Sequence, residues 1–115
     1  MNADTIEEQL DQSLVAIWKT LHQAQAGSAC FIEGLISEIG DEAVAPEQRI
    51  ASVGQAWWPF LAGGRGIFDF CLWSGNPRRD REAKENVREH VERVCQLLKQ
   101  YDSRQERPLS DQRQR

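Results

Sequence analysis

The chain has 115 residues and a formal net charge of -4, with 28% charged and 40% hydrophobic residues. This length fits a single domain with one core, and the negative charge gives no overall attraction to nucleic acid or to an anionic membrane. The charge is uneven, since residues 1–64 hold nine acidic against two basic residues and residues 65–115 hold twelve basic against nine acidic. The asymmetry favours electrostatic matching between the two halves, within one subunit or across an oligomer.

The cysteines and the N-terminal residues bear on the cellular compartment. Cys30, Cys71 and Cys95 are scattered among apolar neighbours and form no C-x-x-C pair, which argues against a disulfide framework and favours a reducing compartment. Residues 1–12 are acidic and lack the basic and then apolar pattern of a signal peptide. The longest apolar stretch, residues 56–73, is interrupted by proline, glycine and charged residues, unlike a membrane-spanning helix. The sequence therefore predicts a cytoplasmic protein.

The first predicted element is an amphipathic helix. Thr5 and Glu8 have the spacing of a capping box, which predicts a helix start, and Gly27 is a plausible C-terminal glycine for a helix ending near residue 26. The apolar residues that recur on one face are Ile6, Leu10, Leu14, Ile17, Trp18 and Leu21. Ser28 then predicts the N-cap of a shorter helix that ends at Gly40. The two form a helical hairpin, or one long helix with a short interruption.

The third predicted helix leads into the most aromatic part of the chain. Pro46 suits the first turn of a helix, whereas Pro59 is expected to kink or end it. Residues 57–73, which we call the aromatic segment, hold three of the four Trp and three of the four Phe around a glycine-rich turn. Residues 67–73 fit a short buried helix, or a strand paired with residues 57–61; the helix is favoured because an isolated hairpin is marginally stable.

The last helix has the clearest pattern. Asn76 and Pro77 predict its N-cap and its first residue. Its apolar residues form a narrow stripe close to a heptad seam, which predicts a homodimer contact through the C-terminal helix. The stripe consists of Ala83, Val87, Val91, Val94, Leu98 and Tyr101. Residues 102–115 are polar and predict a disordered tail.

The predicted fold class is all-α. We expect a small bundle of four or five helices with a Pro/Gly-interrupted aromatic connector, built by a single domain over residues 1–101. The alternative is an α+β fold with one β-hairpin at about residues 57–73.

Motifs for catalysis, metals and cofactors are absent from the sequence. His22 and His90 do not occur in Glu-x-x-His, and no paired donors have the spacing of a zinc site. Residues 63–66 lack both the G-K-[ST] ending and the G-x-G-x-x-G spacing of phosphate loops. Cys71 has apolar neighbours, which favour an inert buried thiol. The sequence predicts no cofactor and no metal.

The predicted binding residues lie in the aromatic segment and at the start of the last helix, because aromatic residues and arginine are typical interface anchors. They are Trp57, Trp58, Phe60, Arg65, Phe68, Asp69, Trp73, Arg78, Arg79 and Arg81. The leading hypothesis is a non-enzymatic interaction or regulatory module that acts as a homo-oligomer. In a second hypothesis, Asp69 or Arg65 anchors a small molecule or substrate in an aromatic pocket. In a third, the basic cluster at residues 78–88 binds nucleic acid, although interleaved acids oppose this.

Overall fold

The computed structural model describes residues 3–63 and 75–113, with side chains described as far as Tyr101. In these ranges the chain forms four helices and no strand: α1 (Ala3–Gln23), α2 (Ser28–Ile39), α3 (Pro46–Ala62) and α4 (Pro77–Arg113). The predicted all-α class is confirmed. A hairpin that begins at residue 57 is wrong, because residues 57–62 belong to α3. The possible fifth helix at residues 67–73 lies outside the described residues.

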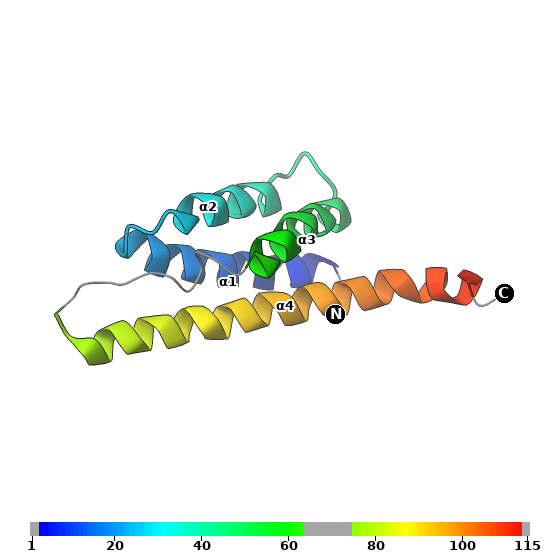
Figure 1. The fold of residues 1–115 in the computed structure, drawn as a ribbon. Helices are drawn as coiled ribbons and strands as arrows, with labels where there is room; N and C mark the ends of the chain where they lie inside the picture. The colour runs from blue at the N-terminus through cyan, green and yellow to red at the C-terminus, as the bar shows by residue number, and fades with distance from the viewer. Residues whose placement is uncertain (1–2, 64–74, 114–115) are drawn as a thin grey trace.

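Helix α1 is the centre of the bundle and packs against each of the other three helices. Figure 1 shows α2 and α4 antiparallel to α1, and α3 antiparallel to α2. Polar contacts agree with this arrangement. His90 of α4 lies 3.4 Å from the Ser13 hydroxyl, and Arg93 donates to the Gln9 side chain at 3.1 Å. The long α4 continues past the end of the other helices (Figure 1).

The apolar stripe of α4 is buried against the rest of its own chain. Val87 and Val94 are fully buried, and Tyr101 is only 6% exposed and donates its hydroxyl to the carbonyl of Glu47 at 3.1 Å. Apolar residues of α1, α2 and α3 complete the same core. A heptad-like stripe fits any single partner helix, and here that partner is chiefly α1. Self-association through α4 would therefore have to use another face of the helix.

The ends of the first two helices differ slightly from the sequence prediction. Helix α1 begins at Ala3 and ends at Gln23, and Gln25 has a φ of 56° in the turn that follows. Gly27 is the N-cap of α2, without a side-chain hydrogen bond, so Ser28 is the first helical residue rather than the cap. The turn separates α1 from α2, and the hairpin interpretation is the right one.

Pro59 lies inside helix α3. Pro59 does not end α3, which continues to Ala62. A proline removes one hydrogen bond, but packing of the buried face holds the last turn.

At the start of α4, Asn76 is the predicted N-cap. Its side-chain oxygen accepts from the amides of Arg78 at 3.0 Å and Arg79 at 3.4 Å. This cap fixes where α4 begins.

Helix α4 extends to Arg113, beyond the predicted end at Tyr101. Half of residues 102–113 are Gln, Glu or Arg, which have good intrinsic helix propensity, and the helix also continues through Pro108. The single domain at 1–101 and the disordered tail at 102–115 stay predictions, although helix is present over most of that tail.

We expect Gly34→Ala to raise the free energy of unfolding by about 0.5 to 1 kcal/mol. Gly34 is exposed in the middle of α2, and a Cβ built there meets no atom within 4 Å. Gly75→Ala is the control with the opposite sign, since Gly75 has a φ of 80° and alanine is strained there. Urea unfolding followed by circular dichroism measures both changes. Shifts of the same sign would contradict the assigned backbone conformations.

Candidate interaction groove

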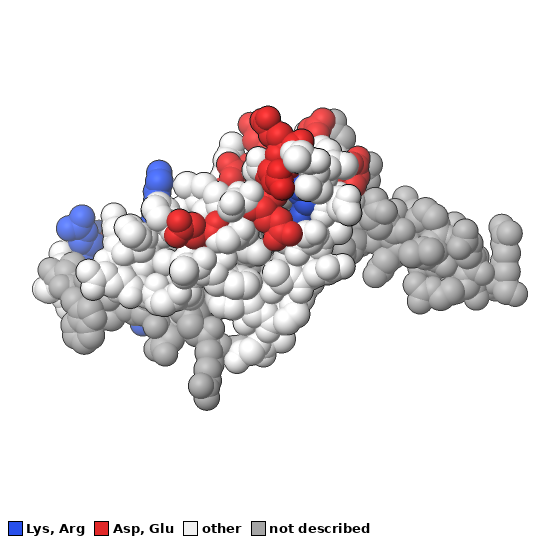
Figure 2. Space-filling model, turned by 90° about the horizontal axis from the view of Figure 1, so that it is seen from above, with Lys and Arg blue, Asp and Glu red and all other residues white. Residues whose placement is uncertain are grey.

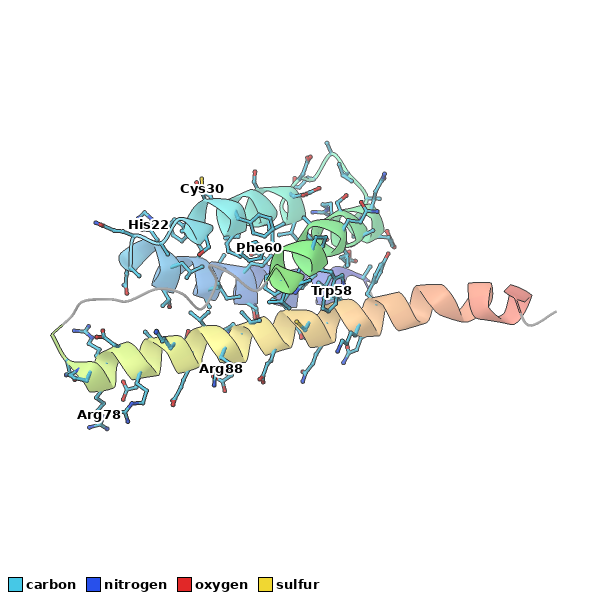
Figure 3. The ribbon with its side chains drawn as sticks, viewed as in Figure 1. His22, Cys30, Trp58, Phe60, Arg78 and Arg88 are labelled. Carbon is cyan, nitrogen blue, oxygen red and sulfur yellow. The ribbon has the colours of Figure 1, made fainter. Side chains whose placement is uncertain are left out.

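The predicted aromatic binding residues of α3 have different environments. Trp57 is fully buried and fills the core, so the prediction that it contacts a partner is corrected. Phe60 is half-buried and stacks on Phe31 of α2, with ring centroids 4.0 Å apart. Trp58 is also half-buried, and Figure 3 shows it on the α4 side of α3. Of these three residues, Trp58 and Phe60 keep part of their surface available.

The remaining predicted residues of the aromatic segment are Arg65, Phe68, Asp69 and Trp73, and they lie outside the described residues. The aromatic pocket that Asp69 or Arg65 would anchor therefore stays a prediction.

The three predicted arginines at the start of α4 are exposed. Arg78 forms an i,i+4 ion pair with Glu82 at 3.3 Å, in which both side chains are more than half exposed. Such a pair contributes little to stability. Arg79 and Arg81 are exposed on the same turn of the helix. Together they give one end of the molecule a basic surface beside the interleaved acids.

An acidic cluster lies at the other end of the bundle and surrounds a buried arginine. Figure 2 shows the acidic side chains gathered over one part of the upper face. Glu7, Glu8, Asp11 and Glu42 border a shallow cavity of about 330 Å³ with Arg49. The Arg49 guanidinium donates to the carbonyl of Ile39 at 2.9 Å and pairs with the Glu7 carboxylate at 2.9 Å.

Arg49 thus links α1, the end of α2 and α3. Its side chain is 9% exposed and that of Glu7 is 22% exposed, so the pair is largely shielded from water. This network was missed from the sequence. The available signal was that Arg49 and Lys19 are the only bases in an otherwise acidic half of the chain.

A groove opens between the end of α3 and the middle of α4. The two helices contact each other where Tyr101 bonds to Glu47, and a Cβ at Gly54 would lie 3.7 Å from Leu98. Farther along, they leave an open space of about 600 Å³, which we call the α3–α4 groove. It is lined by Leu61, Arg88, Val91, Glu92, Cys95, Gln96 and Lys99.

The floor of the α3–α4 groove is apolar and its walls are charged. Val91 is buried, Leu61 and Cys95 are half-buried, and the four polar lining residues are exposed. Sequence reasoning identified the buried stripe of α4 but missed this neighbouring face. The signal was present in the spacing of Arg88, Glu92, Cys95 and Lys99, which recur at helical steps of four, three and four.

Histidine and cysteine side chains are the ones to consider for metal binding and nucleophilic catalysis. No group of three or more His, Cys, Asp or Glu in the described ranges could hold a metal ion. His22 stacks on Trp18 with ring centroids 4.7 Å apart, and the Ser13 partner of His90 is 1% exposed, so a substrate could not reach that hydroxyl. Among the described cysteines, Cys30 and Cys95 are free thiols.

Comparison with known proteins finds no matching family model, no matching curated protein and no matching solved structure. None of the helices in the described residues has the length and apolar character needed to cross a membrane. The candidate site therefore rests on its own geometry.

Proposed function

We propose that this chain is a non-enzymatic helical interaction module that acts as a homo-oligomer in the cytoplasm. The α3–α4 groove carries the proposal, since an open surface with an apolar floor and a charged rim is the usual composition of a protein interface. The half-buried Trp58 adds an aromatic anchor on the α4 side of α3. The free thiols of Cys30 and Cys95 support a reducing compartment.

The mass of the native chain in solution tests this proposal. We expect a dimer that dissociates on dilution, because the groove offers only Leu61, Val91 and Cys95 as apolar contacts beside exposed polar side chains. Sedimentation velocity over a range from about 5 to about 500 μM, suited to weak interfaces, measures the equilibrium. A single species with the mass of one chain over the whole range would contradict the homo-oligomer.

A further inference from the structure

One wall of the α3–α4 groove is a second narrow stripe on α4, beside the stripe that is buried in the core. It consists of Arg88, Glu92, Cys95 and Lys99, which share one face of the helix. Cys95 is half-buried and the three charged residues are exposed. Figure 3 shows Arg88 on the side of α4 that faces away from α2. This stripe is therefore accessible to another helix.

The charged residues of the stripe attract those of a second copy only when the two α4 helices are antiparallel. Glu92 precedes Cys95 by three residues and Lys99 follows it by four. Around a two-fold axis near Cys95, an antiparallel copy of α4 would place Glu92 opposite Lys99 twice, each pair about 5 Å along the helix from the axis. A parallel copy would place Glu92 against Glu92 and Lys99 against Lys99, which is unfavourable.

The ends of the molecule favour the same orientation. Arg79 is 16 residues from Cys95, so antiparallel pairing keeps the two basic helix starts about 50 Å apart, several times the Debye length at physiological salt.

From this geometry we propose that the α3–α4 groove receives a second copy of the same chain, with the two α4 helices antiparallel and the two-fold axis beside Cys95. The inference rests on the proposed homo-oligomer and adds the contact face, the helix direction and the register. Within the stripe, it makes Cys95 the residue closest to its own counterpart across the interface.

Disulfide cross-linking tests the register. The Cys30→Ser, Cys71→Ser variant keeps Cys95 as its one thiol, and the Cys71→Ser, Cys95→Ser variant keeps Cys30 as a matched control. Copper phenanthroline in air takes two electrons from a pair of thiols, which lose two protons as the S–S bond forms. We expect a covalent dimer from the Cys95 variant and at least about fivefold less from the Cys30 variant, although Cys30 is the more exposed thiol, because a disulfide needs Cα atoms within about 7 Å.

Charge reversal tests the pairing of Glu92 with Lys99. We expect Glu92→Lys to weaken dimerisation about tenfold, since two attractive pairs become repulsive, and the added Lys99→Glu change to restore it. Glu33→Lys on α2 makes the same change of net charge at an exposed glutamate and is expected to alter the dissociation constant by less than about twofold. Circular dichroism of each variant checks that the helices are retained.

The outcomes separate this inference from the proposed function. A native dimer in which Cys95 cross-links no better than Cys30, or in which the double charge reversal fails to restore association, overturns the antiparallel α4 contact and leaves the homo-oligomer standing. A monomer at all concentrations overturns both. If Cys95 in that monomer also resists a thiol reagent, the groove is covered by the chain itself, which equally excludes a second copy.

Discussion

Replacement of Trp57 by alanine is expected to lower the free energy of unfolding by about 3 to 5 kcal/mol. Trp57 is fully buried, and it is the largest of the fully buried side chains in the described core. Its ring lies near Phe60, with centroids 6.4 Å apart. Alanine would leave a cavity between the helices that the surrounding side chains fill only in part. Because a domain of this size has a total stability of about 5 to 15 kcal/mol, the variant should unfold at markedly lower urea concentration.

Two variants separate core packing from surface contact. Trp57→Phe should cost less than the alanine change, because it keeps a ring in the core and removes an Nε1 group that is buried without a hydrogen-bond partner in the described part of the chain. Trp58→Ala should also cost less, since Trp58 is only half-buried. Urea titration monitored by circular dichroism gives the three values. Equal losses for Trp57→Ala and Trp58→Ala would contradict the assignment of Trp57 as the core residue of the pair.

The helices could be predicted from the sequence because local chemistry determines them. The capping oxygen of Asn76, the proline at position 46 and the apolar periodicity of each helix act over a few residues. The partner of each helix could not be predicted in the same way. The stripe that contains Val87 and Val94 has the spacing to pack on any helix, in the same chain or in another. That it packs on α1 is a property of the tertiary arrangement, which the stripe alone does not show.

Whether Pro59 would kink or end α3 could not be decided from the sequence, for a related reason. A proline removes one backbone hydrogen bond, but tertiary packing can outweigh that loss. Here Trp57 is buried before the proline, and Phe60 stacks on Phe31 after it. The amide of Gly63 still donates to the carbonyl of Pro59 at 3.0 Å. The last turn is therefore held from both sides of the proline.

The candidate site was only partly predictable. Arginines 78, 79 and 81 are exposed as their sequence context indicates, whereas the α3–α4 groove depends on where two helices separate. That separation is a property of helix crossing and is absent from the residue pattern of either helix. Trp57 was predicted as a binding residue because tryptophan is enriched at interfaces, but tryptophan is also the largest side chain that fills protein cores. Composition alone does not distinguish these two roles.

The Arg49 network has the second large expected effect. Glu7→Ala should lower the free energy of unfolding by about 2 to 3 kcal/mol, because it leaves the Arg49 guanidinium in a site that is 9% exposed without its carboxylate partner. The value lies below that of a fully buried pair, since Glu7 is 22% exposed. Glu8→Ala removes the same charge from the same turn of α1 at an exposed position and should cost less than about 0.5 kcal/mol. Urea unfolding measures both.

A double variant distinguishes loss of the ion pair from loss of packing. In Glu7→Leu, Arg49→Met, both charges are replaced by apolar side chains of similar volume, so no isolated charge remains in the site. We expect this protein to be more stable than Glu7→Ala, with the remaining loss due to the carbonyl of Ile39, which no longer accepts from Arg49. If the double variant were less stable than Glu7→Ala, the hydrogen bond that joins α3 to the end of α2 would contribute more than the ion pair. The order of the two variants thus assigns the stabilising role of Arg49 to one of its two partners.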